Sequence, residues 1–317
     1  MTKKVHSILK HAIFIVLSFF FLGCEEDHTN NILTWTSINV NAAIQQGDAH
    51  LISKNNTHML IDTGHAVYAS NILVPFLKSK HINHIKYILI THPHNDHYGG
   101  IKTLIENDFK IKTIYMNMPT KKQMDREYWG GKYDELLEIQ SLAKKHHIIL
   151  SSVHIGDVLK FDEESFMKVL YVYNGIDTPV GTTDINDMSV ISMLHHGKNR
   201  FLFTGDLNKK LGTFIANDTT DIHADILKAP HHGTEGFAPN AFFERVSPKV
   251  LIVPAPKHLW FQKRSKRTRD LAIKHNYLTY VNGYNQHVTV TSDGEHYTIS
   301  TDRNFTNNDI LGIKNTK

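Results

Sequence analysis

The stretch Ile88-Leu89-Ile90-Thr91-His92-Pro93-His94-Asn95-Asp96-His97 places three histidines and an aspartate in one loop directly after an apolar run. The run from 85 to 91 predicts a buried strand, so the loop lies at that strand's C-terminal end. Some of the chain's 23 histidines must fall together by chance. Imidazoles and a carboxylate are, however, the ligands that zinc and similar cations prefer, and satisfying four such groups without a metal would be costly. The stretch therefore predicts a metal site.

Segments on both sides of this loop alternate between strands and helices. Three strand-like runs separated by turn residues at 46–48 and 55–56 indicate an antiparallel start. Twice along the chain, a series of strands is followed by alternating strands and helices. This order predicts two packed sheets with helices on both outer faces, an α/β four-layered αββα sandwich. The expected strands are 33–40, 49–53, 58–62, 85–91, 111–116, 151–160, 166–173, 188–194, 200–204, 225–229, 249–253, 278–281, 286–291 and 296–300; the expected helices are 67–80, 98–107, most of 121–147, 208–217, 239–246 and 265–275.

The composition fits one large catalytic domain. The chain has 317 residues, of which 41% are hydrophobic. Its 35 basic and 31 acidic residues leave a net charge of only +4, which does not argue for a nucleic-acid coat or a membrane-surface binder. We expect the catalytic domain over 32–302 and a polar, frayed tail over 303–317. No feature of the sequence indicates a protein partner.

The first two dozen residues have the character of an export signal. Lysines at positions 3, 4 and 10 precede an apolar run over 12–22 that is too short to span a bilayer. The run ends in Phe21-Leu22-Gly23-Cys24, which resembles the lipobox of bacterial lipoproteins. Cys24 is the only cysteine, so an intramolecular disulfide is excluded. We expect a lipoprotein signal peptide over 1–24, a linker over 25–31 and an exported protein that Cys24 anchors to a bacterial membrane, on the periplasmic or the cell-surface face; a plain signal peptide or a membrane helix is the alternative.

The histidine loop matches the His-x-His-x-Asp-His signature of the metallo-β-lactamase superfamily, and its flanks resemble that superfamily too. The resemblance implies two divalent metal ions. It assigns His92 and His94 to the first metal, and Asp96 and His97 to the second. Members of the superfamily also have a bridging aspartate at a strand end, which Thr204-Gly205-Asp206 resembles, so Asp206 is the expected bridge.

Two further segments resemble superfamily motifs. Pro230-His231-His232-Gly233 follows an apolar strand, and one of its histidines should complete the second metal. By resemblance to phosphorylcholine esterases of the superfamily we favour His232 as the ligand and His231 as a contact to the substrate or transition state, and the reverse assignment stays open. Asp62 resembles an aspartate that orients ligands by hydrogen bonds without binding metal. Asp96 and His231 are the residues expected to take part in catalysis.

The order of the motifs resembles the hydrolase domain of the DNA-uptake competence proteins of the ComEC type. One departure from the wider superfamily concerns the first metal, since many members have another histidine where this chain has Asn186 and Asp187. The first metal is therefore expected to have His92, His94 and Asp206 as ligands, with Asn186 in a supporting position and with either Asn186 or Asp187 as a further oxygen donor. Because the first metal then has fewer nitrogen ligands, manganese is an alternative to zinc. The elements shared with the competence proteins are 38–40, 46–48, 62–64, 92–97, 186–189, 204–206 and 231–233.

The segment 257–269 is rich in basic residues and contains two aromatics, Trp260 and Phe261. If it follows the competence-protein layout, its basic residues lie beside the metals and hold phosphate oxygens, while Trp260 or Phe261 stacks on a base or a choline-like group. These basic residues are Lys263, Arg264, Lys266 and Arg267. A solvated helix start is the alternative interpretation. The segment favours an anionic substrate, either a small molecule or a nucleic acid.

The expected activity is hydrolysis by a metal-bound hydroxide, because two divalent ions about 3.5–4 Å apart lower the pKa of a shared water toward 7. No Gly-x-Ser-x-Gly elbow or phosphate-binding glycine loop argues for another nucleophile. A phosphodiester is the favoured substrate. One alternative is hydrolysis of a carbonyl compound such as a β-lactam, lactone or thioester on the same metals. Another is a surface lipoprotein that binds a metal or ligand without catalysis.

Overall fold

The computed structural model describes residues 31–40, 45–126, 130–172, 184–234 and 238–313. The chain from Asn31 onward forms one compact unit. Cys24, the expected signal segment and nearly all of the expected linker lie outside the described residues. Among the residues that are described, no helix is both long enough and apolar enough to cross a bilayer.

Two mixed sheets form the centre of this unit. In spatial order, the first sheet consists of β15 (Tyr297–Thr301), β14 (Val288–Ser292), β1 (Leu33–Ser37), β2 (His50–Lys54), β3 (Thr57–Ile61), β4 (His84–Ile90), β5 (Lys110–Met116) and β6 (Ile149–Ser151). The second consists of β13 (Leu278–Val281), β12 (Val250–Val253), β11 (Ile226–Lys228), β10 (Asn199–Phe203), β9 (Ile191–His196), β8 (Ser165–Tyr171) and β7 (Val158–Lys160). The first sheet therefore combines the earliest and the latest strands of the chain.

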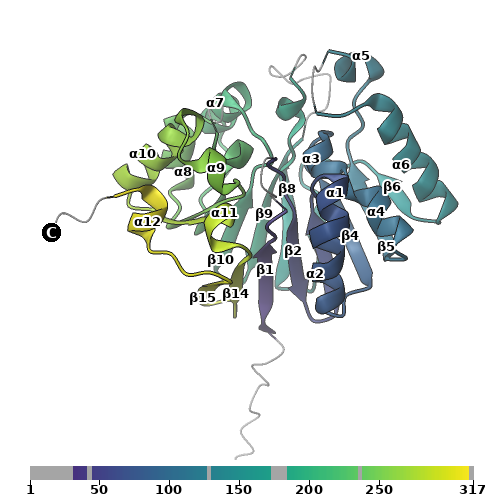
Figure 1. Ribbon diagram of the computed structural model, residues 1–317, viewed down its shortest axis with the longest axis horizontal. Coiled ribbons are helices and arrows are strands. Elements are labelled where there is room, and N and C mark those ends of the chain that lie inside the picture. Colours follow the sequence, from purple (N-terminus) through teal and green to yellow (C-terminus); the bar gives the residue numbers. More distant parts are fainter. Residues whose placement is uncertain (1–30, 41–44, 127–129, 173–183, 235–237, 314–317) are drawn as a thin grey trace, which may run out of the picture. The chain divides into compact units, whose positions relative to one another are not determined.

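Helices cover the outer face of each sheet (Figure 1). The first sheet is covered by helices that include α1 (Ala66–Tyr68), the π-helix η2 (Ala69–Leu73), α2 (Val74–Ser79), α3 (Asn95–Tyr98), α4 (Gly100–Glu106), α5 (Lys121–Met124) and α6 (Tyr133–Lys145). On the second sheet lie α7 (Lys209–Asn217), α8 (Asn240–Val246), α9 (Lys257–Trp260), α10 (Lys266–Lys274) and α12 (Asn307–Leu311). The short helices η3 (Ile185–Met188), η4 (Pro230–Gly233), η5 (Lys263–Ser265) and α11 (Asn282–Asn285) lie in connections.

Alternation along the strands builds three separate apolar layers. Phe201 and Phe203 of β10 point into the core between the sheets, whereas Leu202 belongs to the core beneath the helices of the second sheet. In β4, Leu89 faces the other sheet, and its neighbours Ile88 and Ile90 face the helices. Strands that are buried on both faces read as continuous apolar runs, as these do. The αββα sandwich expected from the sequence is thereby confirmed.

Strand direction brings several loops to one edge of the sandwich. The strands β3, β4 and β5 are parallel to one another, as are β10, β11 and β12, so the loops after their C-terminal ends gather at common edges. Because β2 is antiparallel to β3 and pairs His50 with Ile61, the start of β2 lies beside the end of β3. Residues just before β2 therefore lie beside those that follow β3.

Two expectations from the sequence are wrong. The single strand expected over 151–160 is divided between β6 and β7, which belong to different sheets. The expected polar tail over 303–317 contains α12, whose Thr306 forms a capping box with Asp309. Ile310 is buried, and its carbonyl accepts a hydrogen bond from Trp260 Nε1 at 2.6 Å. Because the segment is polar and rich in asparagine, the sequence did not predict this short helix, which packs on the second sheet.

Candidate metal centre

The loop after β4 is fixed by backbone hydrogen bonds from neighbouring segments. The backbone nitrogen of Thr63 donates to the carbonyl of His97 at 2.7 Å, and that of Asn95 donates to Gly130 at 2.6 Å. Gly100 permits the close approach of α4, because a Cβ there would lie 2.4 Å from the carbonyl oxygen of Thr63. The glycine pair after the histidine motif thus lets the loop pack against the residues that follow β3.

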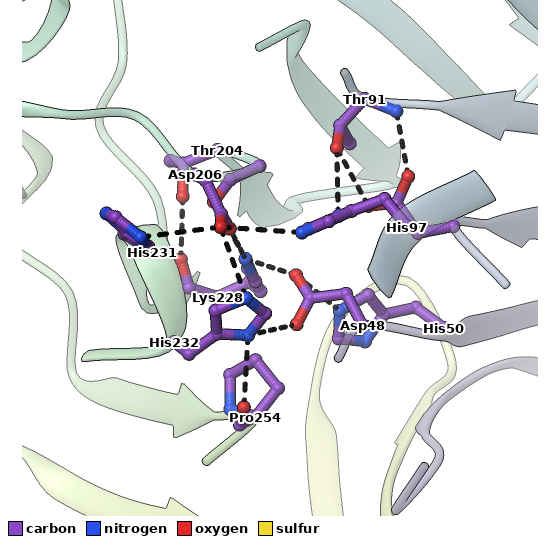
Figure 2. Close-up of polar contacts among 12 residues, drawn as sticks. Asp48, His50, Thr91, His97, Thr204, Asp206, Lys228, His231, His232 and Pro254 are labelled. Carbon is purple, nitrogen blue, oxygen red and sulfur yellow. Dashed lines mark hydrogen bonds and ion pairs between the residues drawn. The ribbon is translucent and has the colours of Figure 1, made fainter. Parts of the chain in front are cut away.

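Four of the predicted metal ligands converge in one cluster. One ligand atom each from Asp96, His97, Asp206 and His232 lies within 4.8 Å of the others. His232 Nε2 is 3.1 Å from Asp206 Oδ2 and 3.3 Å from Asp96 Oδ2, and His97 Nε2 is 3.4 Å from Asp206 Oδ2. Figure 2 shows the rings of His97 and His232 turned toward Asp206. These are the four residues that the resemblance assigned to the second metal.

The cluster fits a divalent cation. Within the described part of the chain, the Nε2 atoms of His97 and His232 are buried and lack a partner in hydrogen-bonding geometry, although carboxylate oxygens lie close by. Two imidazoles and two carboxylates form a donor set suited to zinc or manganese. The ligand atoms therefore surround a common centre at which a cation would fit.

The balance of charges sets the protonation of these ligands. Burial would lower the pKa of His232, but Asp206 and Asp48 raise it well above its ordinary value. Burial would likewise lower the pKa of His97, but Asp206 and Asp62 raise it. Burial would raise the pKa of Asp206, but the adjacent His232 and His97 hold it well below its usual range. Both rings therefore carry protons that a bound cation would displace, as expected for metal ligands.

Asp62 orients His97 as the resemblance implied. Its Oδ2 lies 2.8 Å from His97 Nδ1 and also accepts a hydrogen bond from Thr91 Oγ1 at 2.8 Å, while Oδ1 accepts from the backbone nitrogen of Thr91. Asp62 follows β3 with a left-handed φ of 58°. A buried carboxylate on Nδ1 leaves Nε2 of the ring as the atom that faces the cluster.

The two histidines of η4 lie in different surroundings. His231 and His232 have φ values of 47° and 52°, a left-handed conformation that side chains rarely adopt. This turn buries His232 completely within the cluster. His231 instead lines an open pocket, and its Nε2 is 3.8 Å from Asp206 Oδ2. The structure thus places His232 inside the cluster and His231 on the wall of the pocket.

Residues expected at the first metal are close to each other but do not form such a cluster. His92 Nε2 lies 3.0 Å from His94 Nδ1, and the rings of His92 and His97 are 4.1 Å apart. Among the described residues, no group of three ligand atoms that includes His92 or His94 meets the spacing of the other four. Asn186 lines the same pocket as His94, and its buried Oδ1 has no hydrogen-bond partner among the described residues. The second metal position is therefore the better formed of the two.

A pocket of about 540 Å³ opens beside the cluster. Of the basic residues expected at the substrate, Arg264 lines this pocket and donates to Gln46 Oε1 at 3.4 Å. Lys263 and Lys266 do not line it, and Lys266 pairs with Asp270 at 2.7 Å on the surface. The complete lining is Gln45, Gln46, His65, His94, Asn95, Asp96, Gly130, Asn186, Asp206, His231, Thr234, Leu259 and Arg264.

The expectation that Trp260 stacks on a substrate is wrong. Its side chain is fully buried in the core of the second outer layer, where it donates to the carbonyl of Ile310. Phe261 is 44% exposed, but it does not line the pocket. The aromatic residues of this segment therefore serve packing or face solvent, and of its residues Leu259 and Arg264 line the pocket.

Two buried charged residues of the site were not identified from the sequence. Asp48 lies just before β2, and Lys228 is the last residue of β11. The two form an ion pair, and Asp48 Oδ1 is 3.0 Å from His232 Nδ1 (Figure 2). A lysine within an apolar strand was the available signal, because a buried lysine requires an acidic partner.

Comparisons with known proteins agree with this geometry. A sequence model of the metallo-beta-lactamase superfamily matches residues 43–136. ComE operon protein 3 of Bacillus subtilis strain 168 is 24% identical over 250 residues, which cover 74% of this chain and 30% of that protein. Recombination protein 2 of Haemophilus influenzae is 23% identical over 225 residues, which cover 66% of this chain and 23% of that protein. The chain thus spans less than a third of the length of either relative.

The solved structures support the fold. The metallo-beta-lactamase fold protein YhfI from Bacillus subtilis matches with a TM-score of 0.52 and 12% sequence identity, covering 82% of this chain and all of that one. At this identity the likeness concerns the arrangement of sheets and helices. Together with the family match, it supports the metallo-β-lactamase fold of this chain.

Replacing Asp206 by alanine should remove metal from the purified protein. Its Oδ2 faces both His97 and His232, so we expect at least one metal equivalent to be lost when content is measured by inductively coupled plasma mass spectrometry. Asp225→Ala is the matched control, because Asp225 is largely buried but pairs with Lys249 at 3.0 Å. An unchanged metal content in the Asp206 variant would exclude this residue as a ligand.

Proposed function

Because the chain belongs to the metallo-β-lactamase superfamily, we propose that it is a metal-dependent hydrolase whose substrate is a phosphodiester. The observation that carries this proposal is the convergence of two histidines and two aspartates at the floor of an open pocket. When bound there, divalent cations would activate a water and draw charge from the scissile group.

The residues of the cluster hold and orient what binds between them. Asp206 Oδ2 lies beside both histidines, so its carboxylate would hold the second metal together with them, and the resemblance assigns it the bridge to the first metal. The side chain of Asp96 is 15% exposed, which makes it the least buried of the four ligands and brings it to the pocket surface. Incoming substrate would therefore meet Asp96 before the other ligands.

His231 and Arg264 form the polar wall of the pocket. Burial lowers the pKa of the His231 imidazole, which keeps the ring neutral at neutral pH and lets one ring nitrogen donate a hydrogen bond. The guanidinium of Arg264 lies in the same wall and carries the positive charge that a phosphoryl oxygen would contact. A neutral donor and a fixed cation suit a phosphate group that gains negative charge in the transition state.

A phosphodiester is favoured over a carbonyl substrate for two reasons. Arg264 supplies a cation in the pocket wall, where a phosphodiester carries a charge to match. Two of the relatives have names that refer to a ComE operon and to recombination, which fits nucleic-acid chemistry. A β-lactam, lactone or thioester remains the alternative substrate for the same pocket, and a binding protein without turnover is the third possibility.

We also propose that the protein is exported and anchored in a bacterial membrane by a lipid on Cys24. Support comes from the lysines, the short apolar run and the lipobox-like residues before this single cysteine. Cys24→Ser should leave the protein unprocessed and free of lipid when cells are labelled with radioactive palmitate. Equal labelling of the variant and the native chain would exclude this anchor.

Purified protein loaded with zinc or manganese should hydrolyse bis(p-nitrophenyl) phosphate and leave nitrocefin intact. Arg264→Ala should lower kcat/KM for the phosphodiester roughly 10-fold or more, since a hydrogen bond to a charged group contributes about 1.5–3 kcal/mol. Lys266→Ala is the control, because this neighbouring cation pairs with Asp270 away from the pocket and should have no effect.

The other outcomes of these assays would each support a different function. Turnover of nitrocefin alone would favour the carbonyl substrate. Metal binding without turnover of either compound would favour the non-catalytic protein. Equal losses in the Arg264 and Lys266 variants would show that general surface charge, and not the pocket wall, recruits the substrate.

A further inference from the structure

Lys228 is a buried cation beside the candidate metal ligands. Its side chain is 1% exposed, and three acceptors surround its ammonium group. Nζ pairs with Asp48 Oδ2, donates to the carbonyl of Gly205 at 2.7 Å and lies 3.7 Å from Asp206 Oδ1. The contact to Asp206 is longer than a hydrogen bond, so it is an ion pair, and the ammonium group lies among two carboxylates and a carbonyl.

Asp48 joins this lysine to His232. Its side chain is 1% exposed, with Oδ2 facing Lys228 and Oδ1 at 3.0 Å from His232 Nδ1. The carbonyl oxygen of Pro254 lies 3.2 Å from the same Nδ1, so two acceptors face that ring nitrogen. Nδ1 must therefore carry a proton, and Nε2 is the atom directed at Asp206 and Asp96.

The backbone of Asp48 is also fixed to the metal-binding loop. Its nitrogen donates to the carbonyl of Asp96 at 3.2 Å, and its own carbonyl accepts from the nitrogen of Gly64 at 2.8 Å. Gly47 permits this approach, because a Cβ there would lie 3.2 Å from the Asp96 carbonyl oxygen. The segment before β2 thus connects the histidine loop of the first sheet with ligands that follow strands of the second sheet.

A carboxylate lies beside Nδ1 of each histidine, through a hydrogen bond at His97 and through an ion pair at His232, whose Nδ1 hydrogen bond goes to the Pro254 carbonyl. Asp62 contacts Nδ1 of His97 at 2.8 Å, and Asp48 contacts Nδ1 of His232 at 3.0 Å. Thr91 satisfies Asp62 with two neutral donors, whereas Lys228 satisfies Asp48 with a full positive charge. The same ammonium group also lies 3.7 Å from Asp206 Oδ1, so one cation lies beside two carboxylates of the site.

We propose that Asp48 and Lys228 are positioning residues that fix the ring of His232 and the carboxylate of Asp206 for the second metal ion. This inference rests on the metal-dependent function proposed above. Asp48 sets the rotation of the His232 ring, and Lys228 holds both Asp48 and the Gly205 carbonyl that precedes Asp206. Neither residue needs to contact the substrate, so their loss acts on metal affinity first and on turnover only as a consequence.

Isothermal titration of metal-free protein with zinc and with manganese tests this role. Asp48→Ala should weaken binding at the second position roughly 10- to 100-fold, the usual effect of losing a partner of a metal-bound histidine. Asp48→Asn should weaken it less, because the amide oxygen can still accept from His232 Nδ1. Lys228→Met should also weaken binding, since it releases both Asp48 and Asp206.

Two further variants separate positioning from folding. Lys54→Met is the matched control, since Lys54 is 3% exposed and pairs with Asp162 at 2.8 Å at the far end of β2. It should lower the thermal unfolding midpoint and leave metal affinity unchanged. The double variant Asp48→Asn/Lys228→Met buries no unpaired charge, so it should remain folded by circular dichroism and still bind metal weakly.

The outcomes distinguish this inference from the proposed function. Native affinity in the folded Asp48 and Lys228 variants would overturn the positioning role, as would an equal loss in the Lys54 control. A native protein that binds metal but cleaves no phosphodiester would overturn the proposed function alone, provided that the variants still lose affinity. A native protein that binds neither ion would overturn both.

Discussion

Four aspartates at one edge of the sandwich, three of them buried and Asp96 partly exposed, impose the constraint on which the site depends. Asp48, Asp62, Asp96 and Asp206 lie close together, and each carboxylate must be neutralised by hydrogen bonds, histidines, a lysine or a bound cation. Removing one partner of a buried ion pair costs about 3–5 kcal/mol, whereas an exposed pair such as Lys266 with Asp270 contributes at most about 1 kcal/mol. The buried network, and not the many surface pairs, therefore decides where the ligands lie.

The sandwich meets this constraint by bringing loops from both sheets to one edge. Parallel strands in each sheet end at the cluster, which is why His97 after β4, Asp206 after β10 and His232 after β11 meet although they are far apart in sequence. The αββα arrangement is not specific to one reaction. The chemistry is set by which side chains the loops present, and here these are two imidazoles, two ligand carboxylates and a pocket wall with His231 and Arg264.

Much of this arrangement could be predicted because its signals are local in the sequence. The apolar run before Thr91 and the four ionisable groups after it define a strand end with ligands, and the turn at 55–56 defines a hairpin. The residues of the site that the sequence did not predict have roles that depend on contacts between segments far apart in the chain. Asp48 gains its role only when β2 and β3 pair, and Lys228 only when the two sheets meet. Trp260 was misassigned because its partner, Ile310, lies in a segment whose polar composition hides a helix.

The most direct test of the convergence of these ligands is anomalous diffraction from crystals soaked in manganese or zinc. The account predicts an anomalous peak within coordination distance of Asp96, His97, Asp206 and His232, and a second, weaker peak beside His92 and His94. A peak at some other place on the molecule, or a fully loaded crystal with no peak between these residues, would contradict it.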